Sequence, residues 1–350
     1  MKKWIFVLLA LGMVACSNDD GVDLPDNPNP DPDADVVVQN FMWQAMNLWY
    51  FWQGDVANLA DDAYLTDEEY TAFLASESDP AAFFENQLRF SEDRFTFYSD
   101  DYTELTQGLA GISRNNGMEF GLVQFSGSTN IFGYVRYILP DSDAASKDIS
   151  RGELFTGVDG VTLTLDNYED LLFGDNATYT LNMADITGND IVPNGKEVTL
   201  TKEENFQANP IYLTEVFENI GGQTVGYLMY NRFLNEFDRE LNDAFGFLVS
   251  RGVTELILDL RYNPGGSVNT TRLLASMIYG TNTDEVYLEQ QWNDKIQEAF
   301  TGDDPDALKE YFASAVSSGV PINTLNLRRV YIITSRSTAS GGELLINGLN

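Results

Sequence analysis

The sequence predicts a multidomain protein of mixed class, α/β and α+β, in which a helical block, a strand-rich block and an α/β block follow one another. Three observations predict this. Apolar residues recur at helical spacing from residue 36 to about 106, and short alternating strands and turns fill 107–205. Nearly continuous apolar runs then alternate with helical patterns over 206–350. A chain of 350 residues is long enough for several such domains.

The composition excludes several kinds of site. With 20 Lys+Arg against 54 Asp+Glu, the net charge is −34, and nucleic acid is excluded as a partner because it requires clustered cations. The chain contains no His, so it has no Ser-His-Asp triad, imidazole base or His-ligated zinc. Its single Cys excludes intrachain disulfides and clusters of cysteine ligands. A hydrolase of this composition must take its base from Lys, Asp, Glu or a metal.

The N-terminus predicts export to the cell envelope. Lys2 and Lys3 precede an apolar run over 4–14 that is too short to remain as a membrane span. The run ends at Cys16 and resembles a bacterial lipoprotein signal, with 1–15 as signal peptide and acylation of the Cys16 thiol; an ordinary secretory signal is the alternative. Residues 16–35 are an acidic, Pro-rich tether that we expect to be disordered. The resemblance implies a lipid anchor in the outer membrane, and the acidic residues after Cys16 resemble a signal for display on the cell surface.

The first folded block, 36–106, is predicted to be a helical N-terminal domain. Thr66 with Glu69 forms a capping box that opens one helix, and Asp79-Pro80 is typical of the start of another. Aromatic residues here are expected to be core, with a sugar-stacking platform as the alternative. The first helix shows apolar residues at helical spacing: Phe41, Ala45, Leu48, Trp49 and Trp52.

The second block, 107–205, alternates as half-buried strands do, for example over 120–125, 134–139 and 197–201. A strand, a turn at Pro140, a short helix, a turn at Gly152 and a strand ending at Asp159-Gly160 follow in order. This order resembles a PDZ domain, a module that binds an extended chain end as an added strand. The alternative is a β-rich insertion without a binding role.

The third block, 206–350, has the pattern of an α/β domain. Strands are predicted over 225–230, 255–260 and 330–334, and Gly252 stands where a helix ends. The helix before that glycine has one apolar face: Phe237, Leu241, Ala244, Phe245 and Leu248.

Two motifs in this block carry chemistry. In the first, the strand ending at Leu260 opens into Asn263-Pro264-Gly265-Gly266 and then a helix with Leu273, Leu274, Met277 and Ile278 on one face. Glycines let backbone N–H groups approach a ligand closely, and the helix dipole adds positive potential, which suits an oxyanion hole. The alternative is a plain strand-to-helix turn.

In the second motif, a strand runs through small residues to Ser340, with Gly341, Gly342 and Glu343 opening an apolar helix. A hydroxyl at a helix start faces unpaired amides, and the dipole favours an alkoxide there. The alternative is that Ser340 is a simple N-cap and Glu343 completes its capping box.

Together and in this order, the motifs resemble the C-terminal processing peptidases (tail-specific proteases). That family pairs a Leu-Asp-Leu-Arg-x-Asn-x-Gly-Gly turn with a downstream Ser-Ala-Ser-x-x-Glu element, after a PDZ domain. The resemblance implies a crotonase-like (ClpP/crotonase) catalytic core and Ser340 as nucleophile. It also implies oxyanion amides from Gly341 and from Gly265 or Gly266, with Glu343 as polar support. The helical block is similar to the N-terminal part of Bacteroidetes members.

The family's general base is a Lys on a strand after the helix that the serine opens. This chain stops at Asn350, inside that helix, and Gly341-Gly342 replaces the commoner Ala-Ser pair. We therefore expect the core to be incomplete at its C-terminus, the catalytic Lys to lie outside the 350 residues, and this chain alone to be inactive. The lysines between the tether and the serine stand in no matching motif: Lys147, Lys196, Lys202, Lys295 and Lys309.

The predicted function is a serine endopeptidase of the C-terminal processing type with a Ser/Lys dyad. It would cleave protein or peptide substrates held by the PDZ-like domain, by acylation and then attack of water, with no metal or cofactor. The alternative is a non-catalytic, surface-exposed binding lipoprotein on the same scaffold.

Overall fold

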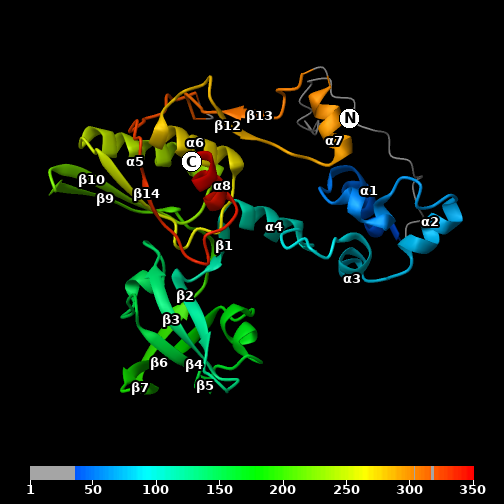
Figure 1. Cartoon of the computed structure of the whole chain (residues 1–350). Helices are drawn as coiled ribbons and strands as arrows, with labels where there is room; N and C mark the ends of the chain where they lie inside the picture. The colour runs from blue at the N-terminus through cyan, green and yellow to red at the C-terminus, as the bar shows by residue number, and fades with distance from the viewer. Residues whose placement is uncertain (1–35, 303, 317–318) are drawn as a thin grey trace, which may run out of the picture. The chain divides into compact units, whose positions relative to one another are not determined.

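The computed structural model describes residues 36–302, 304–316 and 319–350, so the predicted signal peptide, the tether and Cys16 lie outside the described residues. The described chain forms two compact units (Figure 1). The helical unit comprises 36–99 and 288–310, and the sheet unit comprises 100–287 and 311–350. The mixed multidomain α/β class predicted from the sequence is confirmed.

The helical unit is built from short helices around one aromatic core. Residues 288–310 join it from far along the chain, because Asn293 Nδ2 donates to the carbonyl oxygens of Leu48 (2.8 Å) and Tyr50 (2.9 Å). The sequence pattern placed this segment in the α/β block, since a contact between such distant segments leaves no local signal. The elements are α1 (Val37–Trp49), the short helices η2 (Gln53–Asp55) and η3 (Ala57–Leu59), α2 (Asp67–Leu74), α3 (Pro80–Phe83), the π-turn η4 (Phe84–Leu88) and α7 (Asp294–Thr301).

Both predicted helix starts in this unit are confirmed. Thr66 is the N-cap of α2, and its Oγ1 accepts a hydrogen bond from the Glu69 N–H (3.2 Å). The Glu69 carboxylate bonds back to the N–H of Leu65 (2.9 Å), one residue before the cap. Asp79 caps α3, with Pro80 at the first helical position. Local capping chemistry therefore predicted these boundaries.

The predicted buried face of α1 is wrong. Phe41 is 70% exposed and Trp49 is 42% exposed, whereas Trp43 is fully buried and its Nε1 donates to the Asn58 carbonyl oxygen (2.7 Å). Two apolar stripes lie side by side on this helix, so periodicity alone does not choose between them. The stripe that meets the rest of the unit is Met42, Trp43, Met46 and Tyr50.

In the sheet unit, an antiparallel six-stranded sheet, here called the middle sheet, occupies 118–201. The strand order is β2-β3-β4-β6-β7, with β5 beside β4. The predicted sequence of strand, turn, short helix η5 (Ala144–Ser146), Gly152 turn and strand is observed. The strands are β2 (Met118–Gln124), β3 (Ile131–Ile138), β4 (Leu154–Val158), β5 (Val161–Thr162), β6 (Thr178–Thr187) and β7 (Asp190–Thr201).

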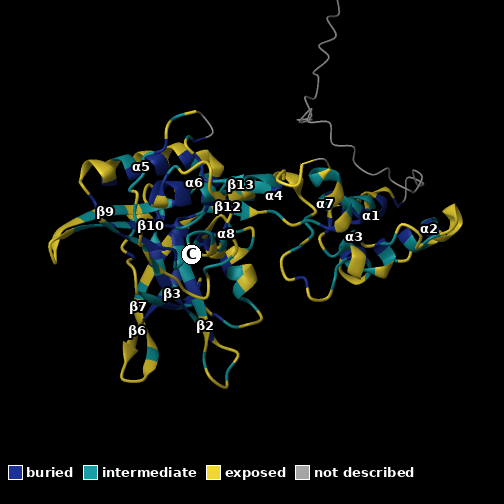
Figure 2. Ribbon diagram, turned by 45° about the horizontal axis from the view of Figure 1, so that its top comes forward, coloured by how far each residue is buried: buried dark blue, intermediate teal, exposed yellow. Residues whose placement is uncertain are grey.

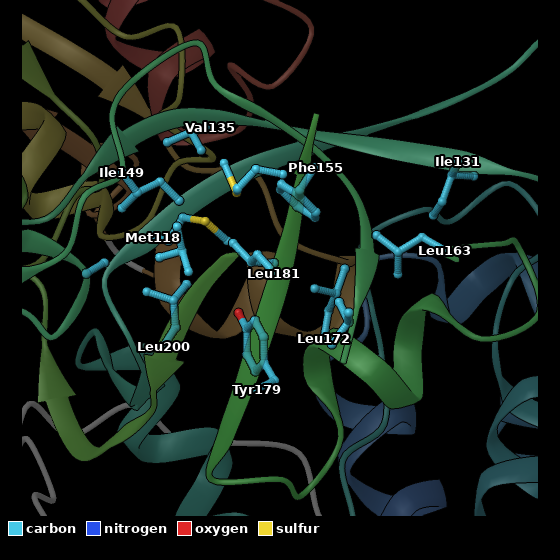
Figure 3. Packing of buried hydrophobic residues seen from close by; sticks show 14 residues of the cluster. Met118, Ile131, Val135, Ile149, Phe155, Leu163, Leu172, Tyr179, Leu181 and Leu200 are labelled. Atoms are coloured by element: carbon cyan, nitrogen blue, oxygen red, sulfur yellow. The ribbon is translucent and has the colours of Figure 1, made fainter. Parts of the chain in front are cut away.

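The core of the middle sheet lies between its inner face and the π-turn η6 (Glu169–Phe173). Figure 3 shows Phe155, Leu181 and Tyr179 pointing into it, and Leu172 closes it from η6. The side chains of β3 alternate between buried and half-buried, as the predicted amphipathic strand requires. The tip of the β6–β7 hairpin is exposed (Figure 2).

A two-stranded antiparallel ribbon of β1 (Ile112–Asn115) and β8 (Glu203–Gln207) flanks the middle sheet in the chain. Helix α4 (Tyr102–Leu109) comes before β1. Tyr137 and Leu139 of the middle sheet pack in one cluster with Met229, which belongs to the sheet of the α/β core. Within the sheet unit, these contacts join the middle sheet to the α/β core.

The α/β core is a four-stranded sheet in the order β14-β11-β10-β9, in which β10, β11 and β14 are parallel and β9 is antiparallel. The predicted strands and the stop at Gly252 (φ 66°) are confirmed. Figure 1 shows α5 and α6 over one face of the sheet. The elements are β9 (Ile211–Ile220), β10 (Gln223–Tyr230), η7 (Asn235–Phe237), α5 (Asp238–Ser250), β11 (Glu255–Asp259), α6 (Val268–Tyr279), β14 (Tyr331–Ile333) and α8 (Gly341–Gly348).

One strand differs from its sequence-based expectation. An apolar run such as 330–334 is typical of a strand that is buried on both faces, but Tyr331 and Ile333 are exposed, because they lie on an open face of the sheet that they share with Ile257. In the described part of the chain, β14 is also an edge strand of this sheet. A further small ribbon pairs β12 (Val286–Glu289) with β13 (Lys309–Tyr311). Among the described helices, none has the length and apolarity needed to cross a bilayer.

Candidate active site

The first motif is fixed at its start by an ion pair between a buried carboxylate and a half-buried arginine. The Asp259 side chain is fully buried at the end of β11, and Arg261 bonds to it from Nε (3.0 Å to each oxygen) and from Nη2 (2.5 Å). The Tyr227 hydroxyl donates to the same carboxylate (2.5 Å). Burial opposes ionisation of Asp259, but these hydrogen bonds outweigh it, so the pKa of the carboxyl lies below its usual range. The carboxylate thus holds the chain where it leaves the sheet.

Asn263 connects three segments of the site. Its side chain is fully buried; Nδ2 donates to the Tyr230 carbonyl oxygen (2.9 Å), and Oδ1 accepts from the Gly265 N–H (2.8 Å). Its own carbonyl oxygen accepts from the Ala339 N–H (3.3 Å). Asn263 therefore ties the end of β10 to the glycine turn, residues 263–266, and to the serine loop, residues 334–340 between β14 and α8.

Both glycines of the turn are required by backbone conformation and by space. Gly265 (φ 108°) and Gly266 (φ 135°) lie in the region that favours glycine. A Cβ on Gly265 would lie 2.7 Å from the Cβ of Ser340, and one on Gly266 would lie 2.1 Å from the Phe233 carbonyl oxygen. The close approach of the turn to Ser340 therefore depends on a missing side chain.

Ser340 is the N-cap of α8, as its N-cap interpretation predicted, but in an unusual conformation. Its φ of 49° and ψ of −113° are rare for a residue with a side chain. Its N–H donates to the Glu343 carboxylate (3.1 Å), and the residue is exposed. Strained backbone of this kind clusters at functional sites, where the surroundings enforce it.

The serine loop is bonded to the first motif at several points. Thr338 Oγ1 donates to the Leu260 carbonyl oxygen (2.7 Å), and the Ser335 hydroxyl donates to that of Arg261. A Cβ on Gly265 would lie 2.8 Å from the nitrogen of Gly341. The structure thus brings together Ser340, Gly341, Glu343, Gly265 and Gly266, the residues that the two motifs singled out.

The amides at this junction differ in their hydrogen bonding. The Gly265 N–H is taken by Asn263, whereas the Gly266 N–H has no acceptor among the described residues. Gly341 is the first residue of α8, where backbone N–H groups have no intrahelical acceptor. Two unpaired amides, from Gly266 and Gly341, therefore stand beside the serine loop.

The described lysines bond to other parts of the chain. Each has hydrogen-bond or ion-pair partners far from the serine in the sequence: Lys147 with Asp143, Lys196 with Asp148 and Glu153, Lys202 with Gly174 and Asn176, Lys295 with Asp61 and Asn47, and Lys309 with Asp306.

Sequence reasoning missed the strand-like segment that holds the glycine turn from behind. The Phe233 N–H donates to the Gly265 carbonyl oxygen (2.9 Å), and the Phe233 carbonyl oxygen accepts from the Ser267 N–H (2.9 Å). The pairing joins residues more than thirty positions apart, and a single aromatic residue after a strand does not signal it. The segment is nevertheless part of the site, because it sets the path of Gly265 and Gly266.

A buried acidic network behind α6 was missed as well. Asp238 is 4% exposed, and its Oδ1 accepts a hydrogen bond from Thr270 Oγ1 (2.7 Å). Its Oδ2 is buried without a hydrogen-bond partner in the described structure. Burial, together with the charges of Glu236 and Glu240, raises the pKa of Asp238 to about 6. Thr270 lies in the first turn of α6, directly after the glycine turn.

The chain is similar to known peptidases in sequence and in structure. The family model Peptidase family S41 matches residues 224–349, and the model Peptidase S41 N-terminal domain matches residues 37–97. A crystal structure from Bacteroides fragilis, described as an S41 protease, is 24% identical; the match covers 92% of this chain and 77% of that one, with a TM-score of 0.60. The photosystem II D1 C-terminal processing protease is 19% identical over 90% of this chain and 78% of that one, with a TM-score of 0.45. No curated protein sequence matches.

Proposed function

Because this chain belongs to peptidase family S41 and is thus a serine-type peptidase, we propose that it is an endopeptidase of the C-terminal processing type with Ser340 as its nucleophile. The observation that carries the proposal is the junction of the two motifs, where only the missing side chain of Gly265 allows Ser340 to approach. Without that junction, the same residues would be an N-cap and an ordinary turn.

The reaction proceeds in two steps. The Ser340 Oγ attacks the carbonyl carbon of the scissile peptide while its proton passes to a neutral amine. The negative charge on the carbonyl oxygen is stabilised by the amides of Gly341 and Gly266. The C–N bond then breaks, the leaving nitrogen takes the proton, and water hydrolyses the acyl-serine ester.

Between the two glycines of the turn, the proposal favours Gly266 as the donor. The Gly265 N–H already donates to Asn263. An oxyanion hole requires amides that are free and preorganised, because their value lies in needing no rearrangement during the reaction. Glu343 supports the site by holding the Ser340 N–H, which keeps that residue in its rare conformation.

For the base, the proposal is a lysine encoded downstream of Asn350. It is supported by the five described lysines, all of which bond elsewhere. Burial would lower the pKa of such an amine enough to leave it neutral. The same observation favours the alternative function, a binding lipoprotein without catalysis, if the reading frame supplies no such lysine.

The experiment expresses the reading frame to its natural end and follows cleavage of an unfolded protein such as casein and of a tagged peptide. We expect cleavage that is lost in Ser340→Ala. Ser337→Ala, a change of the same chemistry three residues away, is the matched control and should retain cleavage. Equal cleavage rates for Ser340→Ala and the unchanged protein would show that Ser340 is not the nucleophile. Tight peptide binding without cleavage would favour the alternative function, a binding lipoprotein without catalysis.

We further propose that the middle sheet is a PDZ-like module that binds the substrate's C-terminal segment. β2 is an edge strand of its sheet, so an extended peptide can add beside it. A cavity of about 230 Å³ adjoins this edge, lined by Phe120 of β2 and Phe173 of η6. Arg114 and Lys202 are the cations that line the same cavity. Arg114 Nε pairs with Glu204 (2.7 Å) and Lys202 bonds to Gly174 and Asn176, but each side chain keeps further N–H groups for a terminal carboxylate. Amidating the C-terminus of a labelled peptide should weaken its binding.

For the location of the protein, the proposal is a lipid anchor on Cys16 in the outer membrane. Support comes from the sequence alone, since Cys16 lies outside the described residues. Metabolic labelling with a fatty acid should mark the protein, and Cys16→Ser should abolish the label and release the protein from the membrane fraction. Label that persists in Cys16→Ser would overturn the anchor.

A further inference from the structure

Two cavities of the sheet unit flank the glycine turn and share part of their walls. The first, about 210 Å³, is lined by Pro264 of the turn and by residues of the middle sheet such as Glu119 and Tyr137. The second, about 410 Å³, is lined by Gly266 and by residues of α4. Arg232 and Leu234 belong to the lining of both cavities. A peptide that runs from one cavity to the other therefore passes Arg232 beside the turn.

The position of Arg232 is fixed by its neighbour. Phe233 is paired with the turn through its N–H and carbonyl group, and its side chain is buried. A Cβ on Gly341 would lie 3.1 Å from Phe233 Cδ2, so this ring faces the start of α8. Because successive side chains of an extended segment point to opposite sides, Arg232 points away from that interior. Its guanidinium thus belongs to the cavity walls, one residue from the site.

Arg232 also has unused hydrogen-bonding capacity. Across the described residues it forms no ion pair and no hydrogen bond, whereas Arg261 and Arg251 pair with carboxylates. Glu236 lines the second cavity too, but no ion pair joins it to Arg232 in the described structure. In a chain with 54 acidic and 20 basic side chains, a half-buried arginine without a carboxylate is unexpected. A planar fork of donors left open in a cavity matches a ligand carboxylate.

The preceding residue is unsatisfied in the same way. Both polar atoms of the Asn231 carboxamide are buried and have no hydrogen-bond partner within the described residues. Asn231 lines the first cavity, and its backbone N–H is used by the Pro210 carbonyl oxygen (2.9 Å). A buried amide without partners is unfavourable, so such groups are usually completed by a ligand or by water. A carboxamide offers N–H donors and a carbonyl acceptor, which complement the C=O and N–H groups of a peptide backbone.

We propose that Arg232 is a specificity-determining residue that binds an acidic side chain, Asp or Glu, of the peptide substrate, while the Asn231 carboxamide hydrogen-bonds to the substrate main chain. This inference rests on the proposed peptidase function. The substrate's terminal carboxylate is assigned to the cavity of Arg114 and Lys202, so the carboxylate at Arg232 comes from a side chain between that terminus and the scissile bond.

The test uses Ser340→Ala protein, which binds peptide without turnover, and fluorescein-labelled peptides read by anisotropy. One peptide series places Asp at successive positions upstream of the C-terminus, and its partner series has Asn there; each is made with a free and with an amidated C-terminus. A charge-assisted pair of this kind gives a preference of about 10- to 100-fold for Asp at one position. Arg232→Ala should abolish that preference, and Arg232→Lys should retain only part of it.

Arg239→Ala is the matched control, because it removes the same charge from an exposed position on α5 that lines neither cavity. It should keep the full preference, and unchanged thermal unfolding of Arg232→Ala verifies that this variant folds. Equal affinity for Asp and Asn peptides at every position, or a preference that survives Arg232→Ala, overturns the inference. A preference that depends on the free C-terminus instead of the Asp side chain also overturns it. Cleavage that survives Ser340→Ala in the full reading frame would refute the proposed function separately, whatever Arg232 selects.

Discussion

The buried carboxyl of Asp238 should make the stability of the sheet unit depend on pH, and Asp238→Asn should remove that dependence. The pKa of Asp238 is raised from 3.8 to about 6, first by burial and then by the nearby charges of Glu236 and Glu240, while Thr270 opposes the shift. The folded state therefore holds a proton that the unfolded state has already released between about pH 4 and pH 6. Stability falls as pH rises through this window.

The size of the effect follows from the two pKa values. A difference of about 2 units corresponds to about 3 kcal/mol over the whole titration. Because the net charge of −34 is lost as carboxylates protonate, the measurement stays at or above pH 5. Integrated from pH 5 to pH 8, the linkage relation gives a loss of about 1.4 kcal/mol in the free energy of unfolding. Asn does not titrate, so the variant should not show this loss. From pH 5 to pH 8, its free energy of unfolding should rise by about 1.4 kcal/mol relative to that of the unchanged protein.

The assay must distinguish the two units. Trp43, Trp49, Trp52 and Trp292 all belong to the helical unit, and the fifth tryptophan, Trp4, precedes the described residues. Tryptophan fluorescence in urea therefore follows the helical unit and serves as an internal control that Asp238→Asn should leave unchanged. Hydrogen exchange of peptides from α5 and α6, measured by mass spectrometry along the same urea series, follows the sheet unit.

Two results would contradict the role of Asp238 in this pH dependence. If the unfolding free energies of the variant and of the unchanged protein run parallel from pH 5 to pH 8, the pKa of Asp238 is not raised by burial. Thr270→Val provides a second test, because it removes the hydrogen bond that favours the ionised form. This change should move the pH window upward, and a downward move would contradict the assignment.

Further predictions concern the site itself. Asn263→Ala removes both buried side-chain hydrogen bonds and should destabilise the sheet unit by about 2–3 kcal/mol in urea; a loss below about 0.5 kcal/mol would contradict its connecting role. Gly266→Ala should lower the free energy of unfolding by more than about 3 kcal/mol, because the new Cβ would clash with the Phe233 carbonyl oxygen. Gly127 also has a positive φ but has open space around it, so the control Gly127→Ala should lower this free energy by only about 1 kcal/mol. Glu343→Ala should lower the cleavage rate of the protein expressed from the full reading frame and should destabilise α8 by about 1 kcal/mol. An unchanged cleavage rate would show that Glu343 does not support the site.

The parts of the fold that sequence reasoning predicted are those with local signals. Thr66 and Asp79 cap helices through bonds to residues three positions on, and Gly252 ends a helix through its own backbone conformation. The parallel strands of the α/β core were visible because burial on both faces leaves an uninterrupted apolar run. Each of these features depends on a window of a few residues, which is what a single sequence displays.

The parts that sequence reasoning missed depend on contacts between distant segments. Trp43, not Trp49, is fully buried in α1, because the rest of the helical unit packs on only one of the two stripes. Asn293 joins the helical unit by bonding to residues about 245 positions earlier. Periodicity describes which residues could share a face, but the partner that covers that face is set by the tertiary fold.

The two interpretations of Ser340 that the sequence left open describe one geometry. An N-cap residue adopts a non-helical conformation and brings its side chain to the first amides of its helix. Ser340 adopts such a non-helical conformation, with φ of 49°; Glu343 stabilises it by accepting the Ser340 N–H, and the space for it exists because Gly265 lacks a side chain. A helix start thereby supplies an unpaired amide at Gly341, and the neighbouring turn supplies a second at Gly266. The capping position therefore places this residue next to the start of α8 and the glycine turn, whose Gly341 and Gly266 amides have no acceptor in the described structure, so an N-cap role does not count against a nucleophile here.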